Sequence, residues 1–161
     1  MSKQFWIFLA AGLAIVALLI AGLLVGTKSA HLELRGKILK VRVLSLGPNA
    51  SLVVTDFRVT NPSAVPFVVS SVEMKLERSS GEAVAGSEVS RVDIDSVFQH
   101  QKLIGPHFND VLTLQDKIGP RQTLDRMAGA RFELPESAVD QRQTIRLRIE
   151  DVDGTTAEIT E

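Results

Sequence analysis

Two hydrophobic patterns divide this chain. From Phe5 to Gly26 there are 22 consecutive residues without a charge, FWIFLAAGLAIVALLIAGLLVG, whereas after Gly26 apolar and polar residues alternate. A bilayer hydrocarbon core of roughly 30 Å is crossed by about 20 helical residues, each adding about 1.5 Å. The first pattern therefore predicts one transmembrane helix over residues 5–26, between a polar tail (1–4) and a linker (27–31).

A cleaved signal peptide is the alternative to a retained helix. Such a peptide has an apolar core of about 7 to 15 residues, followed by a cleavage site between small residues. Here the apolar block is longer, and the nearest candidate site, after Ala30, places Lys28 where a small residue is expected. Trp6 and the flanking Lys3 and Lys28 also suit the two membrane interfaces. We therefore expect a retained, single-pass signal anchor.

Two features of the flanking segments predict opposite orientations of this helix in the membrane. Lys3 and the terminal amine precede it, whereas a larger group of basic residues lies after it: Lys28, Arg35, Lys37, Lys40 and Arg42. This bias favours a cytoplasmic domain. A short polar tail before a long apolar segment is instead usual for an anchor that exports the remainder of its chain. We expect the soluble domain to be extracytoplasmic.

Alternation in the second part of the chain predicts β-strands, because successive side chains of a strand point to opposite faces. In Thr144 to Glu150, the residues Ile145, Leu147 and Ile149 face one way and the polar residues face the other. The turn Asp151-Val152-Asp153-Gly154 and the segment Thr155 to Thr160 then predict a returning strand. Five further segments alternate in the same way, with inward residues Leu32 and Leu34; Val41 and Val43; Phe57 and Val59; Val72, Met74 and Leu76; and Ala130, Phe132 and Leu134.

Turn signals separate these segments at short intervals. They are Gly47-Pro48-Asn49, Asn61-Pro62-Ser63, Ser79-Ser80-Gly81, Gly105-Pro106, Gly119-Pro120 and Pro135-Glu136. Polar residues between the inward ones, including Lys40, Arg42, Asp56 and Arg58, are expected to face solvent. Seven or eight short strands, without an amphipathic helix longer than two turns, predict an all-β domain over residues 32–161. Its expected form is an antiparallel β-sandwich like immunoglobulin or fibronectin type III domains, and a small closed barrel is the alternative.

The stretch from Val53 to Gly86 resembles one known family. Asn61-Pro62, then Pro66, the strand around Val72 to Leu76, and Gly81 with Gly86 match the pattern of the group-2 late-embryogenesis-abundant (LEA-2) family, also called the water-stress and hypersensitive-response domain. The resemblance covers about a quarter of the chain and does not extend to residues 95–126. It implies a seven-stranded sandwich, a membrane-anchored layout, a link to stress tolerance and no catalytic residues.

Charge and cysteine content exclude several functions. Residues 27–161 carry 17 of the 18 basic residues and all 19 acidic ones, a net charge of −2 without a long run of either sign. Nucleic-acid readers normally show a basic stripe or a basic balance, so we expect no nucleic-acid partner. The chain has no cysteine, which excludes disulfides, thiolate metal sites and a thiol nucleophile.

No constellation of residues predicts catalysis. His31 lies beside the apolar segment, while His100 and His107 lie near Asp110 in FQHQKLIGPHFND, without a known ligand spacing. There is no Gly-x-Ser-x-Gly elbow and no glycine-rich phosphate loop. Asp151 to Gly154 resembles a calcium loop only partly, and a hairpin turn explains it better. We therefore predict no catalytic, cofactor-binding or metal-binding residues and no cofactor. Asn49-Ala50-Ser51 is a glycosylation sequon that matters only in a glycosylating pathway.

A cluster of apolar residues lies where the alternation stops. It consists of Phe98, Leu103, Ile104 and Phe108. These residues either cover the core from a loop or, if exposed together, form a patch for a partner. The sequence as a whole predicts a membrane-tethered, non-catalytic module with a structural or interaction role and a protein partner. The alternative is a carrier of a lipid or other small apolar ligand, and an enzyme is the third reading.

Overall fold

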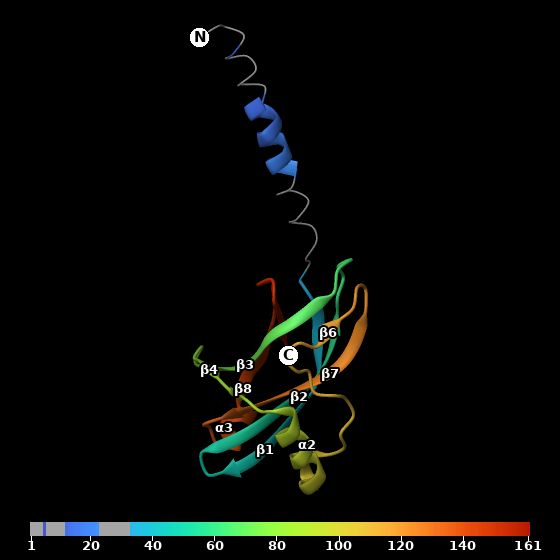
Figure 1. Ribbon diagram of the computed structural model, residues 1–161. Helices are drawn as coiled ribbons and strands as arrows, with labels where there is room; N and C mark the ends of the chain where they lie inside the picture. The colour runs from blue at the N-terminus through green and yellow to red at the C-terminus, as the bar shows by residue number, and fades with distance from the viewer. Residues whose placement is uncertain (1–4, 6–11, 23–32) are drawn as a thin grey trace.

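The computed structural model describes Phe5, residues 12–22 and residues 33–161. Phe5 and residues 12–22 are helical and exposed, and residues 12–22 stand apart from a body made of strands (Figure 1). Within the described ranges, no helix is both long enough and apolar enough to span a membrane. The rest of the expected span 5–26, the tail 1–4, the linker 27–31 and His31 lie outside the described residues.

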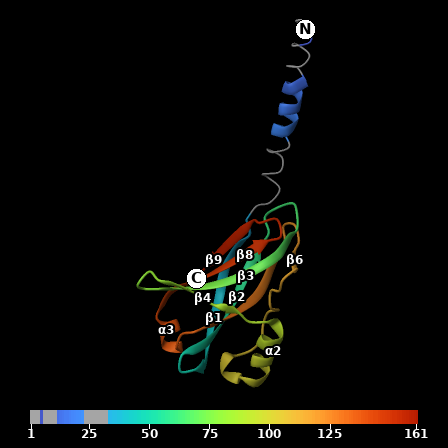
Figure 2. The same cartoon turned by 60° about the vertical axis from the view of Figure 1, so that its left-hand side comes forward.

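The body is made of two antiparallel sheets that pack face to face (Figures 1 and 2). One sheet has the strand order β1-β2-β7-β5, and the other has the order β4-β3-β8-β9, with β6 pairing to β3. The strands are β1 (Arg35–Gly47), β2 (Ala50–Thr60), β3 (Phe67–Arg78), β4 (Ala83–Ala85), β5 (Ser87–Glu88), β6 (Lys117–Ile118), β7 (Thr123–Phe132), β8 (Arg142–Asp151) and β9 (Thr156–Thr160). The order corresponds to the A-B-E-D and C-F-G sheets of an immunoglobulin-like sandwich, with β4 as an added edge strand. The prediction of an antiparallel sandwich is confirmed.

The core lies between the two sheets and is built from the alternating residues. Val53, Phe57 and Val59 of β2 meet Met74 and Leu76 of β3, together with the inward residues of β7, β8 and β9. Ile145, Leu147 and Ile149 are fully buried, as their spacing predicts. The alternation of a half-buried strand therefore fixes which face of β3 and β8 is inside.

The Asn61 turn between β2 and β3 has the structure that its sequence predicts. The Asn61 side chain is fully buried; its Oδ1 accepts from the backbone N–H of Ser63 at 2.9 Å, and its Nδ2 donates to the Val65 carbonyl at 2.8 Å. A second bond, to the Ile118 carbonyl at 3.0 Å, ties the turn to β6. One asparagine therefore both starts the turn and fastens it to the neighbouring strand.

Helical structure in the second half of the chain exceeds the prediction. The structure has a ten-residue helix α2 (Arg91–His100), a 3₁₀ turn η1 (Lys102–Ile104) and a short helix α3 (Glu136–Asp140). The expectation that no helix exceeds two turns is wrong for α2. The sequence shows only a weak apolar periodicity in α2, because Ile94 is the helix's only fully buried side chain and most of the helix surface is solvated.

Candidate functional site

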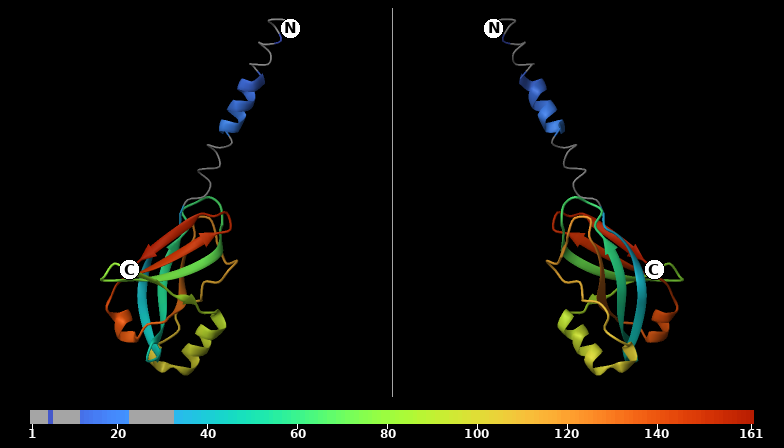
Figure 3. Two further views of the ribbon diagram at one scale, coloured as in Figure 1. Left: turned by 90° about the vertical axis from the view of Figure 1, so that its left-hand side faces the viewer. Right: turned by 90° about the vertical axis from the view of Figure 1, so that its right-hand side faces the viewer.

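The connection between β5 and β7 forms an additional layer outside the sandwich. We call α2, η1 and residues 105–111 the outer layer, which lies on the outer face of β1, β2 and β7. It covers the half of that face next to the β1–β2 turn at residues 48–49, which we call the distal end; β1 begins at the opposite, proximal end (Figure 3). A second apolar cluster joins the two: Leu52, Val54, Ile94, Ile104, Val111 and Met127. Strand β2 is therefore buried on both faces at this end.

Local sequence explains why α2 forms and why it lies so close to the sheet. Ser90 caps the helix, since its Oγ accepts from the backbone N–H of Asp93 at 3.2 Å, as N-terminal caps do. Ile94, Val97 and Phe98 come next at helical spacing and face the sheet. A Cβ on Gly129 of β7 would lie 2.7 Å from the Ile94 side chain. The absence of a side chain at Gly129 therefore makes room for the helix.

A buried ion pair lies beneath the outer layer. Arg42 of β1 and Asp56 of β2 form a salt bridge, and each side chain is only 4% exposed. The alternation predicted that both would face solvent, and this prediction is wrong for both residues. They do point away from the core, but the outer layer covers them. They are buried because a segment distant in the sequence folds over them. The alternation within a single strand does not predict such a cover.

The ion pair fastens the loop after η1. Arg42 Nη1 donates to the Pro106 carbonyl at 2.8 Å, and Asn109 Nδ2 donates to Asp56 Oδ1 at 2.9 Å. His107 Nε2 lies 3.1 Å from Asp95 Oδ1 of α2. The loop is thus held to the sheet at two points and to the helix at a third. Releasing the loop would remove bonds from a buried charged pair, and leaving a buried charge without its partners is costly.

The four apolar residues of this region divide into two pairs. Ile104 is buried, and Phe98 packs against the second cluster. Leu103 is 90% exposed and Phe108 is 67% exposed. The rings of Phe98 and Phe108 lie 5.1 Å and 5.6 Å from the Arg42 guanidinium carbon, within the range of a cation–π contact. The interpretation as core-covering residues is therefore confirmed for Ile104 and Phe98, whereas Leu103 and Phe108 are exposed.

Two clefts border the outer layer. The larger has a volume of about 520 Å³ and lies between β5, the end of β1 and α2. Its lining is apolar at Leu46, Leu52, Val89 and Val97 and polar or charged at Ser87, Glu88, Ser90, Asp93 and Arg131. The smaller, about 300 Å³, is lined by Asp95, Phe98, Gln99 and His107. In the smaller cleft the Phe98 and His107 rings meet edge to face at 4.9 Å.

The described histidines do not form a metal site. His100 ends α2, where its Nδ1 lies 2.8 Å from the Ser96 carbonyl, and His107 contacts Asp95. Asp110 is exposed and receives a backbone bond from Met127. Within the part of the chain that the structure describes, no three His, Asp or Glu residues gather as metal ligands. Asp151 to Gly154 forms the β8–β9 turn, with Gly154 at φ +82°.

The proximal half of the same outer face is uncovered and charged. Arg58 of β2 forms two hydrogen bonds with Asp125 of β7, at 2.7 Å and 2.8 Å. These bonds lower the pKa of Asp125, and the nearby charge of Lys37 acts in the same direction. On the other sheet, bonds to Glu158 and Glu77 raise the pKa of Arg146. Both sheets therefore carry exposed charges, but with different neighbours.

Sequence reasoning missed the residues that build this site, and a signal existed for some of them. Ser90 with Asp93 three residues later is a helix-start signature, and Ile94, Val97 and Phe98 have helical spacing. Together they indicate α2. Nothing in the alternation indicates Arg42 or Asp56, because their burial depends on where the outer layer folds.

No family model matches the chain, and no curated protein matches it. Among solved structures, the ApaG protein from Pseudomonas aeruginosa is similar at 12% identity over 74% of this chain and 94% of that one, with a TM-score of 0.37. The archaellum periplasmic stator protein FlaG from Sulfolobus acidocaldarius shares 9% identity over 80% and 99%, with a TM-score of 0.36. An uncharacterised β-sandwich protein from Clostridium difficile shares 9% over 80% and 85%, with a TM-score of 0.38. At such low identity and TM-score, none of them carries an inference about this chain.

Proposed function

We propose that this chain is a membrane-tethered, non-catalytic β-sandwich module that binds a protein partner through the tip of its outer layer. The tip is Leu103 and Phe108. The observation that carries the proposal is their exposure, 90% and 67%. Leu103 lies in η1 and Phe108 in the loop after it, which the buried Arg42–Asp56 pair fastens at Pro106 and Asn109. Exposed apolar side chains on a loop fixed by a rigid scaffold are typical of a binding surface.

The tether rests on the sequence and on the arrangement of the ends. The 22-residue uncharged stretch is long enough for a bilayer, and its described residues 12–22 are helical and exposed. The outer layer lies at the distal end, away from the start of β1 (Figure 1). In this proposal the domain is extracytoplasmic, and its tip lies at the end of the sandwich remote from the start of β1. The resemblance of Val53 to Gly86 to the LEA-2 family supports a stress-related role.

The binding surface is tested by polar substitution at the tip. Leu103→Ser with Phe108→Ser is expected to weaken binding about tenfold or more, because truncated apolar anchors dominate interface energies. The partner is first identified by photo-crosslinking from position 103, and its affinity is then measured by titration against both forms.

Val152→Ser is the matched control, since Val152 is 59% exposed in the β8–β9 turn. It should leave affinity unchanged, and none of these surface changes should alter stability by more than about 0.5 kcal/mol. Equal binding by the tip variant and the control would contradict the proposed surface.

A carrier of a small apolar ligand is the second candidate, and the 520 Å³ cleft favours it. Its volume falls within the usual range of small-molecule pockets, about 300 to 1,000 Å³. If the cleft is a carrier site, mass spectrometry of the purified chain should detect a retained lipid, and Val97→Trp should remove it by filling the cleft. A chain that retains no lipid in either form leaves the interaction module as the function.

A further inference from the structure

A cationic surface occupies the proximal half of the outer face of β1, β2 and β7. We call Arg35, Lys37, Lys40 and Arg58 the basic platform. Arg35, Lys37 and Lys40 come from β1 and Arg58 from β2, and Lys37 is paired directly with Arg58 in the sheet register. A register shift between Ile38 and Lys40 brings Lys37 and Lys40, which are three residues apart, to the same face. The bulge therefore gathers charges that simple alternation would separate.

The platform has an excess of positive charge. On this uncovered half of the face, the only carboxylate contributed by the three described strands is Asp125, which is bound to Arg58. Within the described residues, no ion pair joins Arg35, Lys37 or Lys40 to an acidic group. All three residues are exposed. The platform thus presents three exposed cations that form no ion pair with a described residue. Asp56 lies opposite Lys40 in the register but is bound to Arg42.

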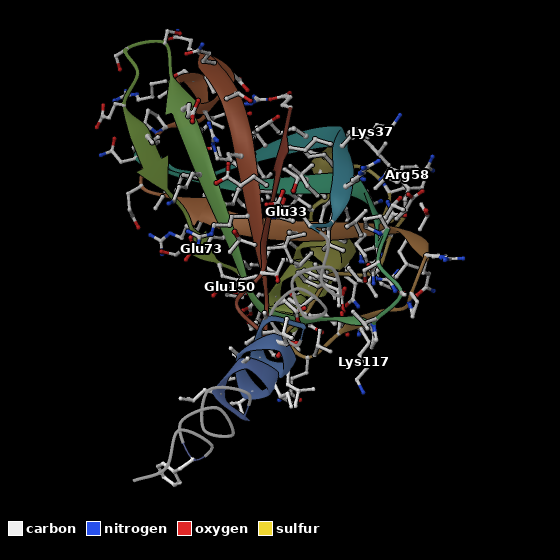
Figure 4. All side chains as sticks on the ribbon, turned by 90° about the horizontal axis from the view of Figure 1, so that it is seen from above. Glu33, Lys37, Arg58, Glu73, Lys117 and Glu150 are labelled. Atoms are coloured by element: carbon white, nitrogen blue, oxygen red, sulfur yellow. The ribbon has the colours of Figure 1, made fainter. Side chains whose placement is uncertain are left out.

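The outer face of the other sheet is neutralised by its own residues. Arg146 pairs with Glu77 at 2.6 Å and with Glu158 at 2.7 Å, and Lys75 lies 4.0 Å from Glu73. In Figure 4, seen from above, Lys37 and Arg58 extend from one side of the molecule, whereas Glu73 and Glu150 lie on another side. Charges of both signs therefore lie together on the outer face of the β3-β8-β9 sheet, whereas the platform is cationic.

Protection of an exposed edge does not account for the whole platform. Lysines and bulges on an edge strand prevent pairing with other chains, and β1 is an edge strand of its sheet. Arg58, however, belongs to β2, which pairs on both sides, with β1 and with β7. The cationic area thus extends beyond the edge onto the face of the sheet.

We propose that the basic platform binds the headgroups of anionic lipids and lays the sandwich on its side against the bilayer. This inference rests on the proposed membrane tether. Strand β1 starts nine residues after Gly26, and nine residues of chain span at most about 30 Å. The tether therefore keeps the platform within reach of the same membrane. Clusters of Lys and Arg close to a bilayer are attracted to anionic headgroups over about one Debye length.

The test uses the full chain, which has no cysteine and so accepts a single label cleanly. Thr123→Cys places a fluorophore on the platform face of β7, beside Thr60, and Thr160→Cys places one on the opposite sheet. Each labelled chain is reconstituted into phosphatidylcholine vesicles, with or without about a third phosphatidylserine, that contain a lipid-bound quencher. We expect quenching at position 123 in anionic vesicles only, and its loss at about 1 M salt, where the Debye length is near 3 Å.

Charge variants separate the platform from other causes. Lys37→Gln with Lys40→Gln should lower the equilibrium constant for the membrane-bound, quenched orientation about tenfold or more. Lys75→Gln with Arg148→Gln removes two cations of the other face and should leave this constant unchanged. Quenching that is equal in neutral vesicles, or insensitive to the Lys37 and Lys40 changes, would overturn the proposal. An adsorbed acidic protein in place of lipid would give no quenching at all, with the same consequence.

Flotation with the same vesicles tests the tether separately. A chain held by its apolar helix floats with neutral vesicles at high salt. If it fails to do so, the tether is wrong. If such a chain still floats with vesicles that contain phosphatidylserine, and needs Lys37 and Lys40 to do so, the platform is supported without the tether. The tether and the platform can therefore be contradicted separately.

Discussion

Asp56→Ala is expected to destabilise the domain by about 3 to 5 kcal/mol, because it leaves the Arg42 guanidinium buried without its partner. The Arg42 side chain is only 4% exposed, so water cannot replace the lost carboxylate while the outer layer stays in place. Asn109 also loses the acceptor for its Nδ2. The loss is measured by urea unfolding of the purified chain, monitored by the circular dichroism of its sheets.

Local opening sets an upper limit on that loss. Arg42 regains water if residues 105–109 detach, so the measured cost cannot exceed the free energy of releasing this loop. Hydrogen exchange distinguishes the two responses: a released loop loses protection at Met127, whose N–H donates to the carbonyl of Asp110 directly after the loop, while the core of β8 keeps its protection.

Removing both charges together provides the control. Arg42→Met with Asp56→Leu replaces the pair by apolar side chains, and such replacements of buried ion pairs are often neutral or stabilising. We expect the double variant to be clearly more stable than Asp56→Ala alone. If the two were equally unstable, the buried charge would not be the source of the loss.

The limits of sequence reasoning depend on which contacts each strand makes. In β3 and β8 one face meets the core and the other meets water, so alternation alone identified Leu76, Ile145 and Leu147 as inward. In β2 both faces are covered at the distal end, and Asp56 is buried although it occupies a polar position in the alternation. A period of two reports the faces of a strand, but it does not report a third layer.

The candidate site depends on that third layer and was only partly predictable. The break in the alternation marks the apolar residues of the outer layer, but their division into buried Ile104 and exposed Leu103 depends on the course of the chain. The turn at Asn61 was predictable because its bonds to Ser63 and Val65 are local. The bulge that assembles the basic platform has no sequence signal, since it depends on the pairing of β1 with β2.

Leu147→Ala is expected to cost about 2 to 5 kcal/mol of unfolding free energy, from lost transfer energy and from the cavity that remains. Leu147 is fully buried at the centre of β8, and its register partners Met74 of β3 and Ile159 of β9 are buried as well. Because all three strands are paired at this point, the backbone cannot collapse into the space. A small domain has a total stability of only about 5 to 15 kcal/mol, so this loss alone approaches the threshold for unfolding.

Arg148→Ala, one residue along β8, is the matched control for Leu147→Ala. Arg148 points to the outer face and is partly exposed, so its removal should change the unfolding free energy by no more than about 0.5 kcal/mol. Arg146→Ala should be less well tolerated than Arg148→Ala, because Arg146 bridges Glu77 and Glu158. Urea unfolding of the variants and the parent gives all three differences. A loss from Arg148→Ala as large as that from Leu147→Ala would show that protein covers this face, and the free outer surface of the β3-β8-β9 sheet would then be wrong.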